Sequence, residues 1–117
     1  MESKDKKIKA EEKKLLGLFK DIEPKKLELA KRLIHKAAYQ CVTLEEMQAD
    51  LDEKGIYEEF QQGKDQKPYD RRRPIFDAYN SMSSSYQKYM KQLMDLLPKT
   101  AIKEDDGFED FIDARQD

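Results

Sequence analysis

The stretch PIFDAYNSMSSSYQKYMKQLMDLL, residues 74–97, decides the fold of this 117-residue chain. Its apolar side chains recur at steps of three and four, which is typical of one face of a helix: Ile75, Tyr79, Met82, Tyr86, Tyr89, Met90, Leu93, Leu96 and Leu97. Pro74 suits the first turn of a helix, and Pro98 ends the pattern. A helix of this length, about 36 Å, must bury its apolar face against other helices, in the same chain or in a second copy.

The composition predicts a small core. Hydrophobic residues make up 38% of the chain and charged residues 41%, and a single domain of this length buries only a modest apolar surface. Either the fold is marginal or copies of the chain share the burial. We therefore predict an all-α fold of three to four helices, in which the long helix at 74–97 contacts other copies through Ile75, Tyr79, Met82, Tyr86, Leu93 and Leu97.

Three shorter helices are predicted ahead of the long one. Residues 5–20 form an amphipathic segment with a weak apolar face. The next helix is predicted to be capped by Asp21, with Pro24 in its first turn. A separate helix is predicted to begin at Thr43, because Thr43 and Glu46 have the spacing of a capping box. We expect that helix to end at Lys54, with Gly55 as the left-handed residue that stops it.

The segment between the helices is less regular. Residues 56–62 fit either one helical turn or a short extended segment, whereas residues 63–73 have no periodicity and are predicted to be a loop. This loop brings Arg71, Arg72 and Arg73 to the start of the long helix. Three cations at a helix N-terminus oppose its macrodipole, which suggests an external anion or an acidic neighbour. The alternative is an ordinary solvated loop.

Charge is distributed in blocks of alternating sign, although the net charge is only −2. Residues 1–36 carry twelve Lys and Arg against seven Asp and Glu, and residues 37–63 carry one against seven. Residues 64–99 are basic again, and residues 100–117 are acidic. Such blocks indicate faces with different partners, or head-to-tail docking of neighbours. Five N-terminal lysines either form a solvated face or contact a polyanion: Lys6, Lys7, Lys9, Lys13 and Lys14.

The sequence gives no sign of catalysis. Cys41 and His35 are single residues of their kind, so we predict no disulfide framework, no metal site and no cofactor. A Ser84–Lys88 pair one helical turn apart is a weak match to a catalytic dyad, and small helix-packing serines explain it more simply. We expect a protein that is not an enzyme, does not cross a membrane and is cytosolic.

Residues 100–117 are predicted to form a flexible acidic tail. Phe108, Phe111 and Ile112 nevertheless occur at helical spacing among the acids. A solubilising tail does not need apolar side chains, so we favour a segment that folds in the groove of a partner.

An ordered series of short motifs in residues 25–98 resembles the small terminase subunit of tailed bacteriophages. The motifs are VTLEE at 42–46, EKGI at 53–56, EEFQQG at 58–63, RPI at 73–75, YN at 79–80, KQL at 91–93 and DLLP at 95–98. The resemblance implies a DNA-packaging protein of the host cytoplasm that has no enzymatic activity. Such subunits assemble into rings, bind viral double-stranded DNA and hand it to the large terminase subunit, which carries the ATPase and nuclease.

With this resemblance, residues 1–99 are expected to form the DNA-binding and oligomerisation domain. The five N-terminal lysines and Arg71–Arg73 would hold phosphates. The tail at 100–117 would dock on the large subunit through Phe108, Phe111 and Ile112. The alternative is a helical protein–protein adaptor that does not bind nucleic acid, in which the charge blocks serve self-association alone.

Overall fold

The computed structural model describes residues 3–97 of the chain. The elements in order are α1 (Lys4–Leu18), α2 (Pro24–Lys54), β1 (Tyr57–Phe60), β2 (Tyr69–Arg72) and α3 (Pro74–Asp95). The fold is mostly helical, as predicted, but it is not purely all-α because β1 and β2 form an antiparallel two-stranded sheet. The tail at 100–117 lies outside the described residues, as does the proline at position 98.

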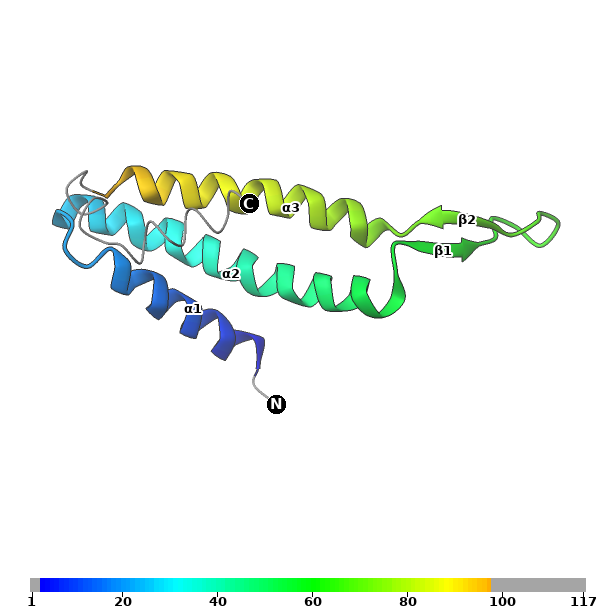
Figure 1. Cartoon of the computed structure of the whole chain (residues 1–117), viewed down its shortest axis with the longest axis horizontal. Helices are drawn as coiled ribbons and strands as arrows, with labels where there is room; N and C mark the ends of the chain where they lie inside the picture. The colour runs from blue at the N-terminus through cyan, green and yellow to red at the C-terminus, as the bar shows by residue number, and fades with distance from the viewer. Residues whose placement is uncertain (1–2, 98–117) are drawn as a thin grey trace.

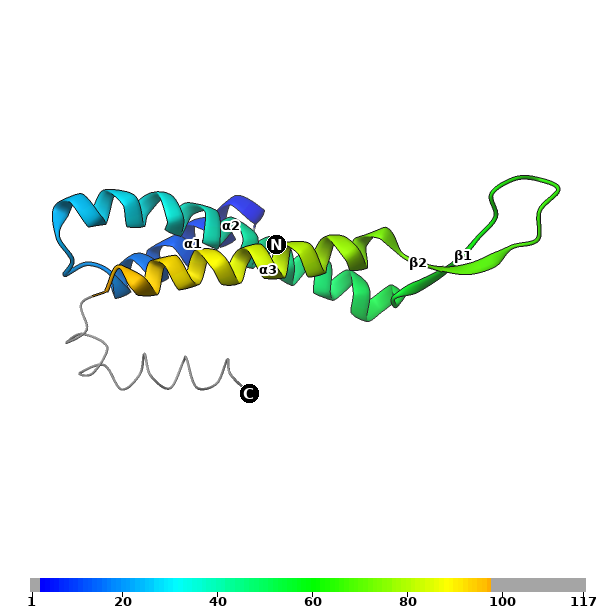
Figure 2. The ribbon, with the colours of Figure 1, turned by 90° about the horizontal axis from the view of Figure 1, so that it is seen from above.

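The two long helices form the axis of the molecule (Figure 1). α2 and α3 run side by side in opposite directions, and α1 lies along α2 from its N-terminal end as far as Glu46. The β-hairpin projects beyond the far end of the α2–α3 pair, and the view from above shows it continuing the long axis (Figure 2). The result is an elongated molecule of 64 × 30 × 25 Å with a third helix at one end only.

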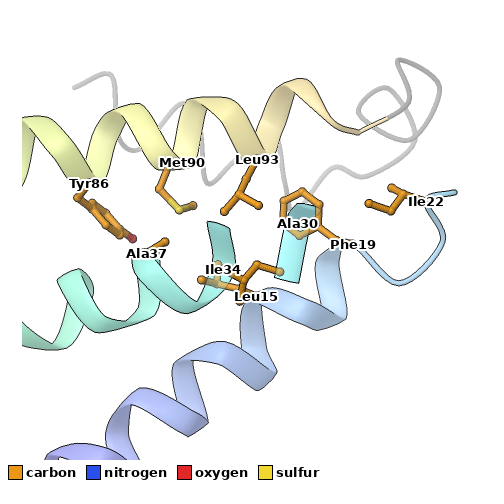
Figure 3. Close-up of a cluster of buried hydrophobic side chains, with 9 residues drawn as sticks. All are labelled: Leu15, Phe19, Ile22, Ala30, Ile34, Ala37, Tyr86, Met90 and Leu93. Carbon is orange, nitrogen blue, oxygen red and sulfur yellow. The ribbon is translucent and has the colours of Figure 1, made fainter. Parts of the chain in front are cut away.

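The core lies where all three helices meet (Figure 3). α1 and the turn after it contribute one group of apolar side chains, α2 contributes small and branched ones, and α3 contributes large ones. Phe19 and Leu93 are the largest fully buried side chains of the described residues. Ala30 and Ala37 on α2 are fully buried, and their small size lets α3 approach closely. The nine core residues are Leu15, Phe19, Ile22, Ala30, Ile34, Ala37, Tyr86, Met90 and Leu93.

The apolar face of α3 is confirmed in its C-terminal half. Tyr86, Met90 and Leu93 are buried, whereas Ile75, Tyr79 and Met82 are half-buried. Ser85, on the same helix, accepts a hydrogen bond of 3.0 Å from the side-chain amide of Gln40 on α2. Ser85 therefore forms a polar link between the two long helices.

The prediction of a separate helix beginning at Thr43 is wrong. α2 runs without interruption from Pro24 to Lys54, and Thr43 lies in its interior. An N-cap residue needs an extended backbone, but Ala38, Val42 and Thr43 are all buried on the packed face of α2. Continuing the helix adds one backbone hydrogen bond per residue and keeps this face intact, so packing outweighs the local capping motif.

The helix ends follow partly different rules from those predicted. Ser3 caps α1, its Oγ accepting from the backbone N–H of Lys6 at 3.2 Å. Asp21 does not cap α2, because the helix begins two residues later, with Glu23 at the cap and Pro24 in the first turn. Gly55 ends α2 as expected: its φ is +82°, a value that side chains with a Cβ rarely adopt.

Residues 56–73 are more regular than predicted. The extended alternative for 56–62 is confirmed by β1, but the loop expected at 63–73 ends in the strand β2. Tyr57 pairs with Arg72 and Phe60 pairs with Tyr69. Cross-strand pairs of this kind depend on contacts between residues far apart in sequence, which short-range periodicity cannot detect.

We expect Leu93→Ala to lower the free energy of unfolding by about 2–5 kcal/mol, because it removes a buried side chain from the three-helix core. Urea denaturation followed by circular dichroism measures this loss. Gln92→Ala is the matched control, since Gln92 is exposed on the same helical turn. Equal stability of the two variants would contradict the assignment of the core.

Candidate nucleic-acid interface

The five N-terminal lysines lie on α1, and all are exposed. Four of them divide between two flanks of the helix, and Lys6 lines neither of the two grooves described below. Lys9 and Lys13 line one open groove between α1 and α2, whereas Lys7 and Lys14 line another. Because α1 is docked on α2, the two flanks face different residues of α2 and differ in charge.

The first groove is the more basic of the two. It has a volume of about 370 Å³, and Lys31 of α2 completes a set of three lysines there. Leu16 and Ile34 form its apolar floor, and Glu12 is the acidic residue of its lining. The Glu12 carboxylate already has a partner, since His35 Nδ1 lies 2.6 Å from its Oε1. We refer to Lys9, Lys13 and Lys31 as the lysine groove.

The lysines of this groove are available to an external anion. Lys9 pairs with Asp5 at 3.4 Å, but both side chains are more than 70% exposed. Ion pairs of that exposure contribute little to stability and exchange readily. The groove can thus present its ammonium groups to a phosphate at small cost.

The second groove has mixed charge. Lys7 and Lys14 are accompanied there by Glu11 of α1 and Glu45 of α2. Lys4, at the start of α1, is also engaged: it pairs with Glu46 at 3.0 Å and lies over the ring of Tyr39 at 4.7 Å. This flank holds α1 on α2 and is less suited to a polyanion.

Arg71–Arg73 do not form one basic patch. Each arginine has an acidic partner within the chain. Of the explanations that the sequence left open, the structure therefore shows acidic neighbours. Arg71 pairs with Glu58 across the hairpin at 2.7 Å, and its guanidinium carbon lies 3.6 Å from the centre of the Phe60 ring. Arg72 pairs with Asp77 in the first turn of α3 at 3.1 Å. An acid in that turn also offsets the unfavourable placement of cations at a helix N-terminus.

Arg73 has a structural position at the junction of α2, the hairpin and α3. Its side chain is only 14% exposed and donates to Asp50 Oδ2 at 2.5 Å and to the Gly55 carbonyl at 2.8 Å. Its backbone N–H donates to the Ile56 carbonyl at 2.6 Å. The hydrogen bond from Arg73 holds the pKa of Asp50 below its ordinary value, and Lys54 at 3.4 Å acts in the same direction. Arg73 therefore joins the ends of two helices and has little freedom to reach a phosphate.

The other predicted sites are placed as follows. Tyr86 and Leu93, two of the expected oligomer contacts, are buried inside the chain and offer no surface to a second copy. Ile75, Tyr79, Met82 and Leu97 are half-buried. The expected docking residues Phe108, Phe111 and Ile112 lie outside the described residues.

Lys31 is the basic residue that the sequence analysis missed. It belongs to the same face of α2 as Leu27 and Ile34, a helical spacing that was visible in the sequence. Its proximity to Lys9 and Lys13 became apparent only when the docking of α1 was known.

We find no match to this chain among protein-family models, curated proteins or solved structures. The resemblance to small terminase subunits therefore depends on the sequence motifs alone. Across residues 3–97, none of the helices has the length and apolar character to span a membrane. The same part of the chain contains no group of three His, Cys, Asp or Glu side chains that could hold a metal ion.

We expect Asp50→Asn to lower the melting temperature at neutral pH, because it removes the charged partner of Arg73. A carboxyl whose pKa is lowered by folding stabilises the protein above its unfolded pKa, near 3.8, and this stabilisation is lost as the pH falls through the lowered value. The difference between wild type and variant should thus be full at about pH 7 and fade below about pH 4.

Thermal melts across this pH range measure the effect. Asp52→Asn is the control, since Asp52 is exposed on the same stretch of α2. A difference between wild type and Asp50→Asn that is unchanged at acidic pH would contradict the assigned role of the carboxylate.

Proposed function

We propose that this chain is a small terminase subunit that binds viral double-stranded DNA, assembles into a ring and regulates or recruits the large terminase ATPase and nuclease. The observation that carries the proposal is the lysine groove, an accessible basic surface on a chain whose net charge is negative. DNA affinity depends chiefly on Lys and Arg side chains that meet phosphates. Of the two basic clusters considered from the sequence, the N-terminal one includes the open lysine groove. In the other, acids of the same chain hold Arg71 and Arg73, and only Arg72 has a largely exposed ion pair.

The arrangement of the helices supports the assembly part of the proposal. Lys4, the first residue of α1, pairs with Glu46, so the last two turns of α2 extend past α1. Met47 and Leu51 on that part of α2 are half-buried, as are Ile75 and Tyr79 opposite them on α3. Apolar side chains left half-covered in a two-helix section are suited to contact a second copy, and head-to-tail contacts between copies close into rings.

The docking of the large subunit remains a proposal from the sequence. It is assigned to Phe108, Phe111 and Ile112 in the acidic segment at 100–117, for which the resemblance and the apolar spacing are the support.

We expect the triple variant Lys9→Ala, Lys13→Ala, Lys31→Ala to bind double-stranded DNA more weakly than wild type. Its affinity should also depend less on salt, because each lost phosphate contact lowers the slope of log K against log salt by about 0.9. Fluorescence anisotropy with a labelled duplex at several salt concentrations measures both quantities.

The matched control is Lys7→Ala, Lys14→Ala, Lys88→Ala, which removes the same charge from other exposed positions. If both variants lose affinity equally, the DNA site is not the lysine groove. If wild type itself does not bind DNA at moderate salt, the adaptor alternative is favoured, in agreement with the internal ion pairs of Arg71, Arg72 and Arg73.

A further inference from the structure

The β-hairpin has two open edges. β1 and β2 pair only with each other among the described residues, and the hairpin projects past the ends of α2 and α3 (Figures 1 and 2). Each strand therefore presents one row of backbone N–H and C=O groups that no strand in the described part of the chain satisfies. A two-stranded hairpin in water is marginal by itself, and an open edge is a template for pairing with another strand.

Side-chain contacts join the two strands on one face of the hairpin. Glu58, Phe60, Tyr69 and Arg71 lie on the same side of the two strands. The Arg71 guanidinium stacks on Phe60 and pairs with Glu58, and the rings of Phe60 and Tyr69 meet edge to face with centres 5.9 Å apart. These contacts hold the strands in position before any partner arrives, which lowers the entropy cost of pairing.

The register identifies the backbone groups that face outward. The Arg73 N–H donates to the Ile56 carbonyl, so Ile56 and Arg73 form a hydrogen-bonded pair. Antiparallel pairs alternate between hydrogen-bonded and non-hydrogen-bonded, so the Glu59–Asp70 pair is of the second kind. The N–H of Glu59 consequently points to the open edge of β1, and that of Asp70 points to the open edge of β2.

The two edges differ in charge. β1 carries two acids, Glu58 and Glu59, whereas β2 carries two bases, Arg71 and Arg72, and one acid, Asp70. Pairing β1 of one copy with β1 of another would place glutamates against glutamates, and like charges on paired strands are destabilising. Pairing β2 of one copy with β1 of the next can place Arg72 opposite Glu59, since Arg71 is already paired with Glu58 of its own hairpin. Arg72 is available for this contact, because both it and its partner Asp77 are more than half exposed.

We propose that the open edge of β2 pairs with the open edge of β1 in a second copy of this chain, in head-to-tail fashion. Each hairpin then continues a sheet that passes from copy to copy, and copies related by rotation about one axis keep all neighbouring strands antiparallel. Four-residue strands bury too little for a stable interface on their own. The strands set the direction of assembly, and the half-covered section of α2 and α3 adds apolar area. This inference rests on the ring assembly in the proposed function and names its interface.

The first test uses proline at an outward-facing position. Glu59→Pro removes the N–H on the open edge of β1 but leaves the hydrogen bonds within the hairpin, since proline is tolerated where an edge N–H faces solvent. Glu59→Thr is the matched control, because it removes the same charge and keeps the N–H. Light scattering after gel filtration measures the mass, and circular dichroism measures the helix content.

We expect Glu59→Pro to lower the mass of the assembly at unchanged helix content, and Glu59→Thr to retain most of it. A Glu59→Pro assembly with the mass of wild type would overturn the strand-pairing inference and leave the ring itself in place. A wild-type chain that is monomeric at micromolar concentration would overturn the ring assembly as well. DNA binding, measured separately, reports on the rest of the proposed function.

The second test does not require the hairpin to stay folded with a proline in β1. Glu59→Cys and Arg72→Cys are made in a Cys41→Ser background and treated with a short thiol cross-linker, alone and mixed. Head-to-tail pairing predicts cross-linked dimers in the mixture and none with either variant alone. Dimers of Glu59→Cys alone, or no dimers in any sample, would overturn the proposal.

Discussion

The contact between α2 and α3 is the interaction on which the rest of the structure depends. Fully buried Ala30 and Ala37 on α2 allow α3 to approach, and Met90 and Leu93 fill the space between the helices. The turn after α1 adds Phe19 to this contact at one end of the pair (Figure 3). A chain this rich in charged residues concentrates its apolar side chains there, because burial of apolar surface is the main term that offsets the loss of conformational entropy. The other end of the α2–α3 pair, next to the hairpin, therefore has fewer buried apolar side chains.

The features that could be predicted from the sequence are those set by local rules. Helical spacing and a proline at each side placed the long helix at 74–97, and the structure has it at Pro74–Asp95. Glycine at position 55 ended a helix as expected. The same rules failed at Thr43, where a capping motif sits inside α2, because burial against neighbouring helices outweighs a preference of about 1 kcal/mol. β2 was missed because its residues do not alternate between apolar and polar, and its stability comes from partners in β1.

The charged residues also divide into features that the sequence predicts and features that depend on tertiary contacts. The sequence reveals that three arginines precede a helix, and it raises the question of what neutralises them. It cannot reveal that the partners come from three different elements: Asp50 in α2, Glu58 in β1 and Asp77 in α3. For the lysines, helical spacing along α1 already separates Lys9 and Lys13 from Lys7 and Lys14. The third member of their groove belongs to another helix, so tertiary docking was needed to find it.

The unbroken course of α2 has a mechanical consequence. A helix of 31 residues is about 46 Å long, and this one carries the lysine groove near its beginning and the junction with the hairpin at its end. Had the chain broken at Thr43, the two ends could have swivelled independently. α2 is instead one continuous helix, and Arg73 joins its C-terminal end to the start of α3. A change in the orientation of α2 at one end therefore moves the other end as well.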